Sequence, residues 1–274
     1  MAGLALRGIR APINAVASLV GFIGGACNGC AYERVEISEG LHGISALAPG
    51  ADCRRVILYF HGGGHWLLTA DTYREFIGRL SAFTGARVVA VEYRKPPAAQ
   101  FPSGVFDALA AWQWAEASHP GASVAVAGDS SGANLAFALL VQLAQLGQEQ
   151  PVACVGISPW LRLDLSDTWD YYGRFCAHLY LGGRKDVSAA DPLVSPVNAQ
   201  PPLVRRFPPI LMHAGAHEMT TAGVVEMEKV CADAGAPAEV HFYKAPHIFQ
   251  VTAGFPQQTR DSLTRIAEFL QRHW

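Results

Sequence analysis

The sequence predicts an α/β fold in which helices flank a mostly parallel central sheet. Apolar, β-branched runs of the length of buried strands occur at residues 56–60, 88–93, 124–127, 153–157, 210–214 and 240–243. Segments with the apolar spacing of helices occur at residues 71–84, 106–117, 131–146, 220–234 and 257–273. Because the two kinds of segment alternate along the chain, parallel strands joined by crossover helices are the expected arrangement.

Size, composition and charge limit the classes of function that the chain can serve. Its 274 residues, 50% apolar and 16% charged, suit one large domain with a substantial core. The net charge is −2 and no more than two Lys or Arg residues are adjacent, so we expect no nucleic-acid partner. The sequence has no HExxH, Walker or dinucleotide-binding motif, so we expect neither a metal nor an organic cofactor.

Gly128-Asp-Ser-Ser-Gly132 lies between the predicted strand at 124–127 and the helix at 131–146. This is the pattern of a nucleophile elbow, a sharp strand-to-helix turn with a strained serine at its apex. Glycine at both ends leaves the room that the turn needs. We therefore expect Ser130 to be a nucleophile, and Asp129 to be structural because it flanks the elbow on the side away from substrate.

A second glycine motif, His61-Gly-Gly-Gly64, follows the predicted strand at 56–60. Glycines allow the main chain to approach a substrate, so the loop can offer N–H groups to a developing oxyanion. We expect the oxyanion hole to use the N–H groups of Gly63, Gly64 and Ser131, with His61 bracing its own loop. The two motifs together, each after a strand, indicate an acyl-transfer hydrolase.

A serine nucleophile needs a histidine base and an orienting carboxylate. In α/β-hydrolases these follow the serine in the order acid, then histidine, each after a later strand. Among the ten histidines, His247 alone lies just past a late strand and before the last helix. Glu218 follows the strand at 210–214 and is the expected acid. Asp191 is the rival, but it precedes that strand and is followed by Pro192, which indicates a turn.

Two segments fall outside the alternating pattern. Residues 160–209, rich in aromatic residues, Gly and Pro, are predicted to be a cap insertion within a hydrolase domain at 35–274. Residues 1–34 are predicted to be an N-terminal cap segment of a cytoplasmic protein. The alternative is export, because Arg7 and Arg10 precede an apolar stretch that resembles a signal peptide up to residue 26. Polar residues and glycines make that stretch a poor membrane span.

The six cysteines are scattered, and Cys154 lies in an apolar strand run. This distribution favours reduced thiols in the cytoplasm over a disulfide framework. Cys27 and Cys30 form a lone C-x-x-C pair with no second pair to complete a zinc site. We interpret the spacing as coincidence.

The motifs in combination resemble the hormone-sensitive-lipase-like, or family IV, esterases of the α/β-hydrolase superfamily. Besides the two glycine motifs, with the elbow continuing to Asn134, they are Asp191-Pro-Leu-Val-Ser-Pro196, Gly215-Ala-His-Glu218, His247-Ile-Phe249, and Tyr93-Arg94 with Phe101-Pro102. The resemblance runs from about residue 56 to the C-terminus. The chain departs from the family at Ala98 and Ala99, where members carry an acidic residue and a histidine. It also has Ser131 in place of the usual alanine and Glu218 in place of the commoner aspartate.

This resemblance implies an α/β-hydrolase fold with a small cap. It further implies a serine carboxylesterase for short- to medium-chain esters, with catalytic Ser130, Glu218 and His247. Trp66 and Trp160 are the foremost candidates to line the substrate pocket, together with Trp169, Tyr171 and Tyr172, although each is equally suited to core packing. The resemblance also makes a homodimer through the last strand or helix plausible.

The sequence leaves two alternative functions open. The same triad would serve lactone, carbamate or formamide hydrolysis, or acyl transfer, since all share the acyl-enzyme. A non-catalytic small-molecule receptor on this fold, like the gibberellin receptors, is disfavoured because such receptors lack the catalytic histidine.

Overall fold

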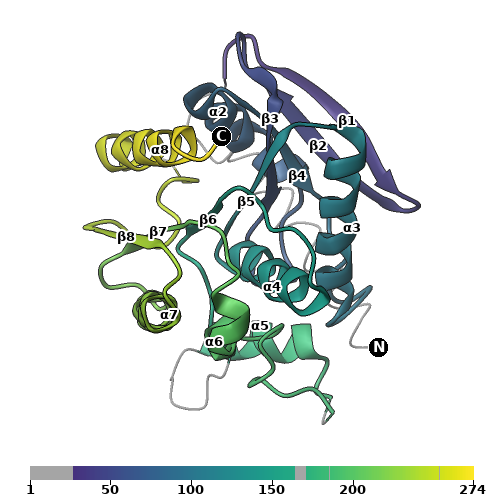
Figure 1. The fold of residues 1–274 in the computed structure, drawn as a ribbon, viewed down its shortest axis with the longest axis vertical. Coiled ribbons are helices and arrows are strands. Elements are labelled where there is room, and N and C mark those ends of the chain that lie inside the picture. Colours follow the sequence, from purple (N-terminus) through teal and green to yellow (C-terminus); the bar gives the residue numbers. More distant parts are fainter. Residues whose placement is uncertain (1–26, 164–170, 185, 253) are drawn as a thin grey trace.

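The computed structural model describes residues 27–163, 171–184, 186–252 and 254–274, which form an eight-stranded sheet with helices on both faces (Figure 1). The strands lie in the order β1-β2-β4-β3-β5-β6-β7-β8. From β4 to β8 all neighbours are parallel, whereas β1–β2 and β2–β4 are antiparallel. The predicted α/β architecture is therefore confirmed.

Six strands confirm the six predicted apolar runs. They are β3 (Asp52–Phe60), β4 (Ala86–Val91), β5 (Ser123–Asp129), β6 (Cys154–Ile157), β7 (Ile210–Gly215) and β8 (Ala238–Tyr243). Because these strands are parallel, their carboxyl ends share one edge of the sheet, where the loops that follow them can meet.

The first two strands were not predicted. β1 (Ala31–Ser38) and β2 (Leu41–Leu47) form a hairpin at the edge of the sheet. Only Ile37 of β1 is buried, so the strand has no apolar run to reveal it. β1 takes up the last four residues of the segment 1–34 that was expected to be a cap.

Two groups of helices cover the sheet. The helices α2 (Arg74–Thr84) and α8 (Pro256–Gln271) pack on one face, with one turn of 3₁₀-helix, η1 (Asp71–Tyr73), before α2. The other face carries α3 (Ser103–Ser118), α4 (Ser131–Leu146) and α7 (Thr221–Ala234). Between residues 131 and 144 every side chain of α4 is buried, so this helix has a fixed position behind the elbow.

The segment between β6 and β7 contains α5 (Tyr171–Leu181), a 3₁₀ turn, η2 (Pro196–Asn198), and the short α6 (Pro201–Val204). Asn134 of α4 fastens it to the domain, since the amide nitrogen donates to the carbonyl oxygens of Trp160 at 3.0 Å and Val194 at 2.9 Å. Trp169 and residues 1–26 lie outside the described residues. The domain division at residue 35 and the cap role of residues 160–209 stay predictions.

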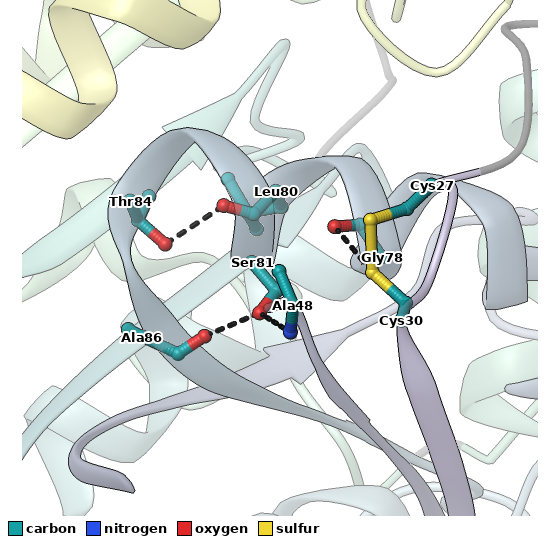
Figure 2. The surroundings of a disulfide bond; sticks show 8 residues. All are labelled: Cys27, Cys30, Ala48, Gly78, Leu80, Ser81, Thr84 and Ala86. Atoms are coloured by element: carbon teal, nitrogen blue, oxygen red, sulfur yellow. Dashed lines mark hydrogen bonds between the residues drawn. A yellow bond between two sulfur atoms is a disulfide. The ribbon is translucent and has the colours of Figure 1, made fainter. Parts of the chain in front are cut away.

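Cys27 and Cys30 form a disulfide (Figure 2), so the prediction of reduced thiols and of a coincidental C-x-x-C was wrong for this pair. The two residues begin and end a tight turn in which the Cys30 N–H donates to the Cys27 carbonyl oxygen and Gly29 has a φ of 77°. The turn brings their Cα atoms to 5.6 Å, within the range that a disulfide spans. The Asn28-Gly29 pair between them is the sequence signal for this turn.

The disulfide lies against Gly78 of α2 (Figure 2). A side chain at residue 78 would collide with the Tyr32 hydroxyl, so the glycine allows the start of β1 to pack on this helix. Cys154 and Cys231 are buried free thiols, and Cys53 is an exposed one. Within the described part of the chain, no helix has the length and hydrophobicity that a membrane crossing requires.

Candidate active site

Four loops with the predicted site residues follow four parallel strands at the same edge of the sheet. The glycine loop follows β3, Ser130 follows β5, Glu218 follows β7 and His247 follows β8. The structure brings Ser130, His247 and Glu218 together, although 117 residues separate the serine from the histidine.

Ser130 has the strained backbone that the elbow motif predicts, with a φ of 52° and a ψ of −120°. Three main-chain hydrogen bonds hold it there. Its N–H donates to the Ile157 carbonyl oxygen at 2.9 Å, and its own carbonyl accepts from Asn134 and Trp160. Gly132 is required because a Cβ atom there would overlap the carbonyl oxygen of Phe60 at the end of β3. The start of α4 therefore lies directly against β3, and Ser130 has little freedom to move.

The hydroxyl of Ser130 lies 3.0 Å from Nε2 of His247, within hydrogen-bonding distance. On the other side of the imidazole ring, Nδ1 lies 3.4 Å from Oε2 of Glu218. This second distance is long for a hydrogen bond, and Nδ1 has no hydrogen-bond partner among the described residues. Hydrogen bonds of this kind often tighten only when substrate binds. The arrangement can transfer a proton from the hydroxyl to the imidazole while a carboxylate stabilises the resulting charge.

Two hydroxyl groups hold the Glu218 carboxylate. Thr220 Oγ1 donates to Oε1 at 2.5 Å, and Ser158 Oγ donates to Oε2 at 2.9 Å. Burial opposes ionisation of Glu218, but the contact with His247 and these two hydroxyls outweigh it, so the pKa of the carboxyl is below its usual value. Glu218 is therefore a carboxylate near neutral pH.

Sequence reasoning did not identify Ser158, which links the acid and histidine loops. Its Oγ donates to Glu218 and accepts the Ile248 N–H at 3.1 Å, one residue after His247. Ser158 is fully buried and has a φ of 46°, so β6 presents it in a fixed, strained position. A Ser-Pro pair after a strand is too common a signal to reveal this role.

Asp191, the rival acid, makes hydrogen bonds within its own turn. Its Oδ1 accepts the Leu193 N–H at 2.8 Å, and its carbonyl accepts from Val194 and Ser195. These contacts make it the cap of a tight turn, as Pro192 indicated.

The N–H groups of Gly63, Gly64 and Ser131 donate no hydrogen bond to any other described residue. Gly63 has a φ of 116°, and a Cβ atom there would overlap the carbonyl oxygen of Leu67. The loop thus depends on a backbone conformation that glycine alone adopts readily. The assignment of these three N–H groups to an oxyanion hole stays a prediction, and donors without a partner in the protein are what such a hole would need.

Helix α5 lies on the glycine loop. A Cβ atom at residue 64 would be 2.6 Å from Cys176 Sγ and 3.5 Å from the Tyr172 hydroxyl. Trp66 and Trp160 are each only 5% exposed, and Trp66 contacts Phe175 of α5 edge to face. Both tryptophans therefore serve core packing, and their contact with substrate stays a prediction. Tyr171 is 81% exposed and points away from the core.

Asp129 joins the elbow to the glycine loop. Its carboxylate accepts hydrogen bonds from the Tyr59 hydroxyl at 2.7 Å, the Tyr73 hydroxyl at 2.6 Å and the Gly62 N–H at 2.9 Å. The side chain is fully buried, which raises its pKa to about 6 despite these three donors. These contacts support the structural role expected for Asp129.

His61 contacts its own loop, since its Nδ1 lies 2.8 Å from the Gly62 carbonyl oxygen. Its ring stacks on Tyr93 at 4.6 Å. Among the described residues, no group of three or more His, Cys, Asp or Glu side chains could hold a metal ion.

Comparison with known proteins places the chain among esterases. Residues 57–251 match the family described as having the alpha/beta hydrolase fold. An acetyl-hydrolase of Streptomyces hygroscopicus is 34% identical over 218 residues, which are 74% of this chain and 70% of that protein. The carboxylesterase/phospholipase LipF of Mycobacterium tuberculosis is 29% identical over 79% of this chain, which spans 62% of LipF. A crystal structure of an esterase from the bacterial hormone-sensitive lipase family has a TM-score of 0.85 and 27% identity, covering 95% of this chain and 90% of that one.

Replacement of Asp129 by Asn should change how stability depends on pH. Because the folded-state pKa of about 6 exceeds the ordinary 3.8, the folded protein binds this proton more tightly than the unfolded chain does. The resulting stabilisation is present below about pH 4 and is lost as the pH rises through about 6. We therefore compare the free energies of unfolding of the wild type and of Asp129→Asn. The difference, wild type minus variant, should fall by on the order of 3 kcal/mol as the pH rises from about 4 to above about 6. Urea unfolding of both proteins from pH 4 to pH 7 measures this, and a difference independent of pH would contradict the assignment.

Proposed function

This chain belongs to the α/β-hydrolase family and is a carboxylic ester hydrolase like its hormone-sensitive-lipase-like relatives, and we propose that it acts through an acyl-enzyme on Ser130. The single observation that supports this most is the 3.0 Å contact between Ser130 Oγ and His247 Nε2, with Glu218 behind the same ring. A serine hydroxyl is a weak nucleophile unless a base accepts its proton.

In the proposed reaction, Ser130 Oγ attacks the ester carbonyl carbon while its proton moves to His247 Nε2. The carbon–oxygen bond to the alcohol then breaks, and the leaving alkoxide takes that proton from His247. Water attacks the acyl group next, giving its proton to His247, and Ser130 recovers a proton when the carboxylic acid leaves. Glu218 stays ionised throughout and keeps the Nδ1–H of His247 directed toward itself.

The N–H groups of Gly63, Gly64 and Ser131 would bind the oxyanion of both tetrahedral intermediates. These donors belong to loops whose conformations Gly63, Ser130 and Asp129 fix before substrate arrives, so no reorganisation is needed during the reaction. Loss of one donor of this kind typically costs about 3 kcal/mol in the transition state.

The proposed substrates are esters of short- to medium-chain carboxylic acids. The space beside Gly64 supports this, because a Cβ atom there would already meet Cys176 and Tyr172 of α5. The names of two relatives agree with it. One is the Streptomyces acetyl-hydrolase, and the other is an ethyl acetate hydrolase of Pseudomonas putida, 42% identical over 32% of this chain and 29% of that protein.

Lactones, carbamates, formamides and acyl transfer to an alcohol remain the alternative reactions, because all of them proceed through the same acyl-enzyme. The receptor alternative is not favoured, since His247 is present and contacts Ser130. A homodimer stays a prediction. For the compartment, the scattered buried thiols favour the cytoplasm, whereas the Cys27–Cys30 disulfide favours export to an oxidising compartment.

Ser130→Ala should reduce ester hydrolysis by about 10⁶-fold, because the nucleophile and its covalent intermediate are lost. Its thermal midpoint should stay within about 3 °C of the wild type, since the hydroxyl contributes little to folding. Initial rates on p-nitrophenyl acetate, butyrate, octanoate and palmitate test both the serine and the chain length. The control is Ser118→Ala at the exposed end of α3. Substantial activity in Ser130→Ala, or a rate that peaks at palmitate, would contradict the proposal.

Glu218→Gln should lower kcat by about 10³- to 10⁴-fold, because an amide does not hold the imidazole in the required tautomer or stabilise its charge. The matched control is Asp191→Asn, which keeps the oxygen that accepts from Leu193 and should change kcat by no more than about twofold. Steady-state kinetics of the two variants decide between the acids. The reverse order of effects would make Asp191 the triad acid.

A further inference from the structure

A lysine is buried behind the glycine loop. Lys95 lies four residues past the end of β4 and is only 4% exposed. Its ammonium group contacts Glu92 Oε1 at 2.5 Å, His61 Nε2 at 3.2 Å and the Tyr93 carbonyl oxygen at 3.4 Å. Buried lysines are rare in proteins unless they are paired. The contact with Glu92 compensates the charge, but it does not explain why the lysine also meets His61.

The contacts of Lys95 fix which nitrogen of His61 carries the proton. An ammonium group donates hydrogen bonds and accepts none, so Nε2 of His61 must be the acceptor. The proton of the neutral ring is then on Nδ1, which lies 2.8 Å from the Gly62 carbonyl oxygen and donates to it. The two contacts are on opposite sides of the ring and require the same tautomer.

The rest of the surroundings hold the ring in place. Tyr93 stacks on it at an interplanar angle of 24°, and the Tyr93 hydroxyl donates to the His61 carbonyl oxygen at 2.7 Å. Glu92 in turn accepts the Ala70 N–H at 2.7 Å, so the residues after the glycine loop are fastened to the same cluster.

The direction of one peptide group follows from this tautomer. The Gly62 carbonyl and the Gly63 N–H belong to one planar trans peptide and point in opposite directions. When His61 holds the carbonyl toward itself, the Gly63 N–H must point away from His61. This N–H donates to no other described residue. With an Nε2–H tautomer, lone pairs on Nδ1 and on the carbonyl oxygen would repel each other and the peptide would be free to turn.

We propose that Lys95 is a positioning residue for ester hydrolysis: it holds His61 in the Nδ1–H tautomer, which aims the Gly63 N–H at the oxyanion. This inference rests on the proposed function, because it assigns Gly63 to the oxyanion hole. Lys95 itself touches no reacting atom.

The principal test is Lys95→Met, which keeps an unbranched side chain, one atom shorter, and removes its donors. We expect kcat to fall by about 10- to 100-fold with KM changed by no more than about twofold, since a misdirected donor costs less than a deleted one. A trifluoromethyl ketone, which forms a tetrahedral adduct with the serine, should lose affinity by the same factor as kcat/KM. The matched control is Lys229→Met, which removes an exposed lysine paired with Asp233 on α7.

Nitrogen NMR of the protein labelled at its histidine rings gives a second readout that needs no activity. The His61 signals, assigned by their loss in His61→Gln, should show a protonated Nδ1 in the wild type and a mixture of tautomers in Lys95→Met. If Lys95→Met does not fold because Glu92 is left unpaired, Glu92→Gln/Lys95→Met removes both charges and takes its place in every measurement.

A wild-type His61 protonated at Nε2 would overturn the proposal, and so would an unchanged tautomer with unchanged kcat in the lysine variant. A loss of activity confined to KM, without the matching loss of inhibitor affinity, would show a structural role only. Failure of the proposed function is distinguishable from failure of this inference. If the proposed function is wrong, Ser130→Ala retains activity, and the NMR measurement still shows whether Lys95 fixes the tautomer of His61.

Discussion

The carboxylate of Asp129 joins the two loops on which the site depends. It lies at the end of β5, directly before Ser130, and it accepts the N–H of Gly62 in the glycine loop. Two tyrosine hydroxyls, from Tyr59 of β3 and Tyr73 of η1, complete its hydrogen bonds. A buried carboxylate that has three donors is costly to displace, because any lost donor leaves charge without a partner. The nucleophile and the proposed oxyanion donors therefore hold a fixed separation.

Two further polar clusters hold the other parts of the site. Ser158 and Thr220 hold Glu218, and Ser158 also holds the loop of His247, so the acid and the base are positioned by one hydroxyl. On the other side, Lys95 and Glu92 reach the glycine loop through His61. The site thus consists of loop segments that buried side chains behind them hold in place. This kind of preorganisation is what oxyanion stabilisation requires.

The parts of the site that the sequence revealed are those with local signals. Ser130 and the glycine loop lie in short motifs between a strand and a helix, and Glu218 and His247 follow late strands in the expected order. Ser158, Thr220 and Lys95 have no such signal, because their roles depend on contacts that only the folded chain creates. The sequence does not reveal the β1–β2 hairpin because its first strand is almost wholly exposed. It does not reveal the Cys27–Cys30 disulfide because the C-x-x-C spacing alone does not show that a tight turn joins the two cysteines.

The covalent role of Ser130 is the central claim, and active-site labelling tests it most directly. An alkyl fluorophosphonate loses fluoride when a serine hydroxyl attacks its phosphorus, and the adduct does not depend on the rate of deacylation. Mass spectrometry with peptide fragmentation, which separates Ser130 from the adjacent Ser131, locates the adduct. We predict one phosphonyl group per chain on Ser130, with loss of esterase activity in proportion to labelling. Activity that survives an excess of the reagent, or an adduct on any other residue, would contradict the claim.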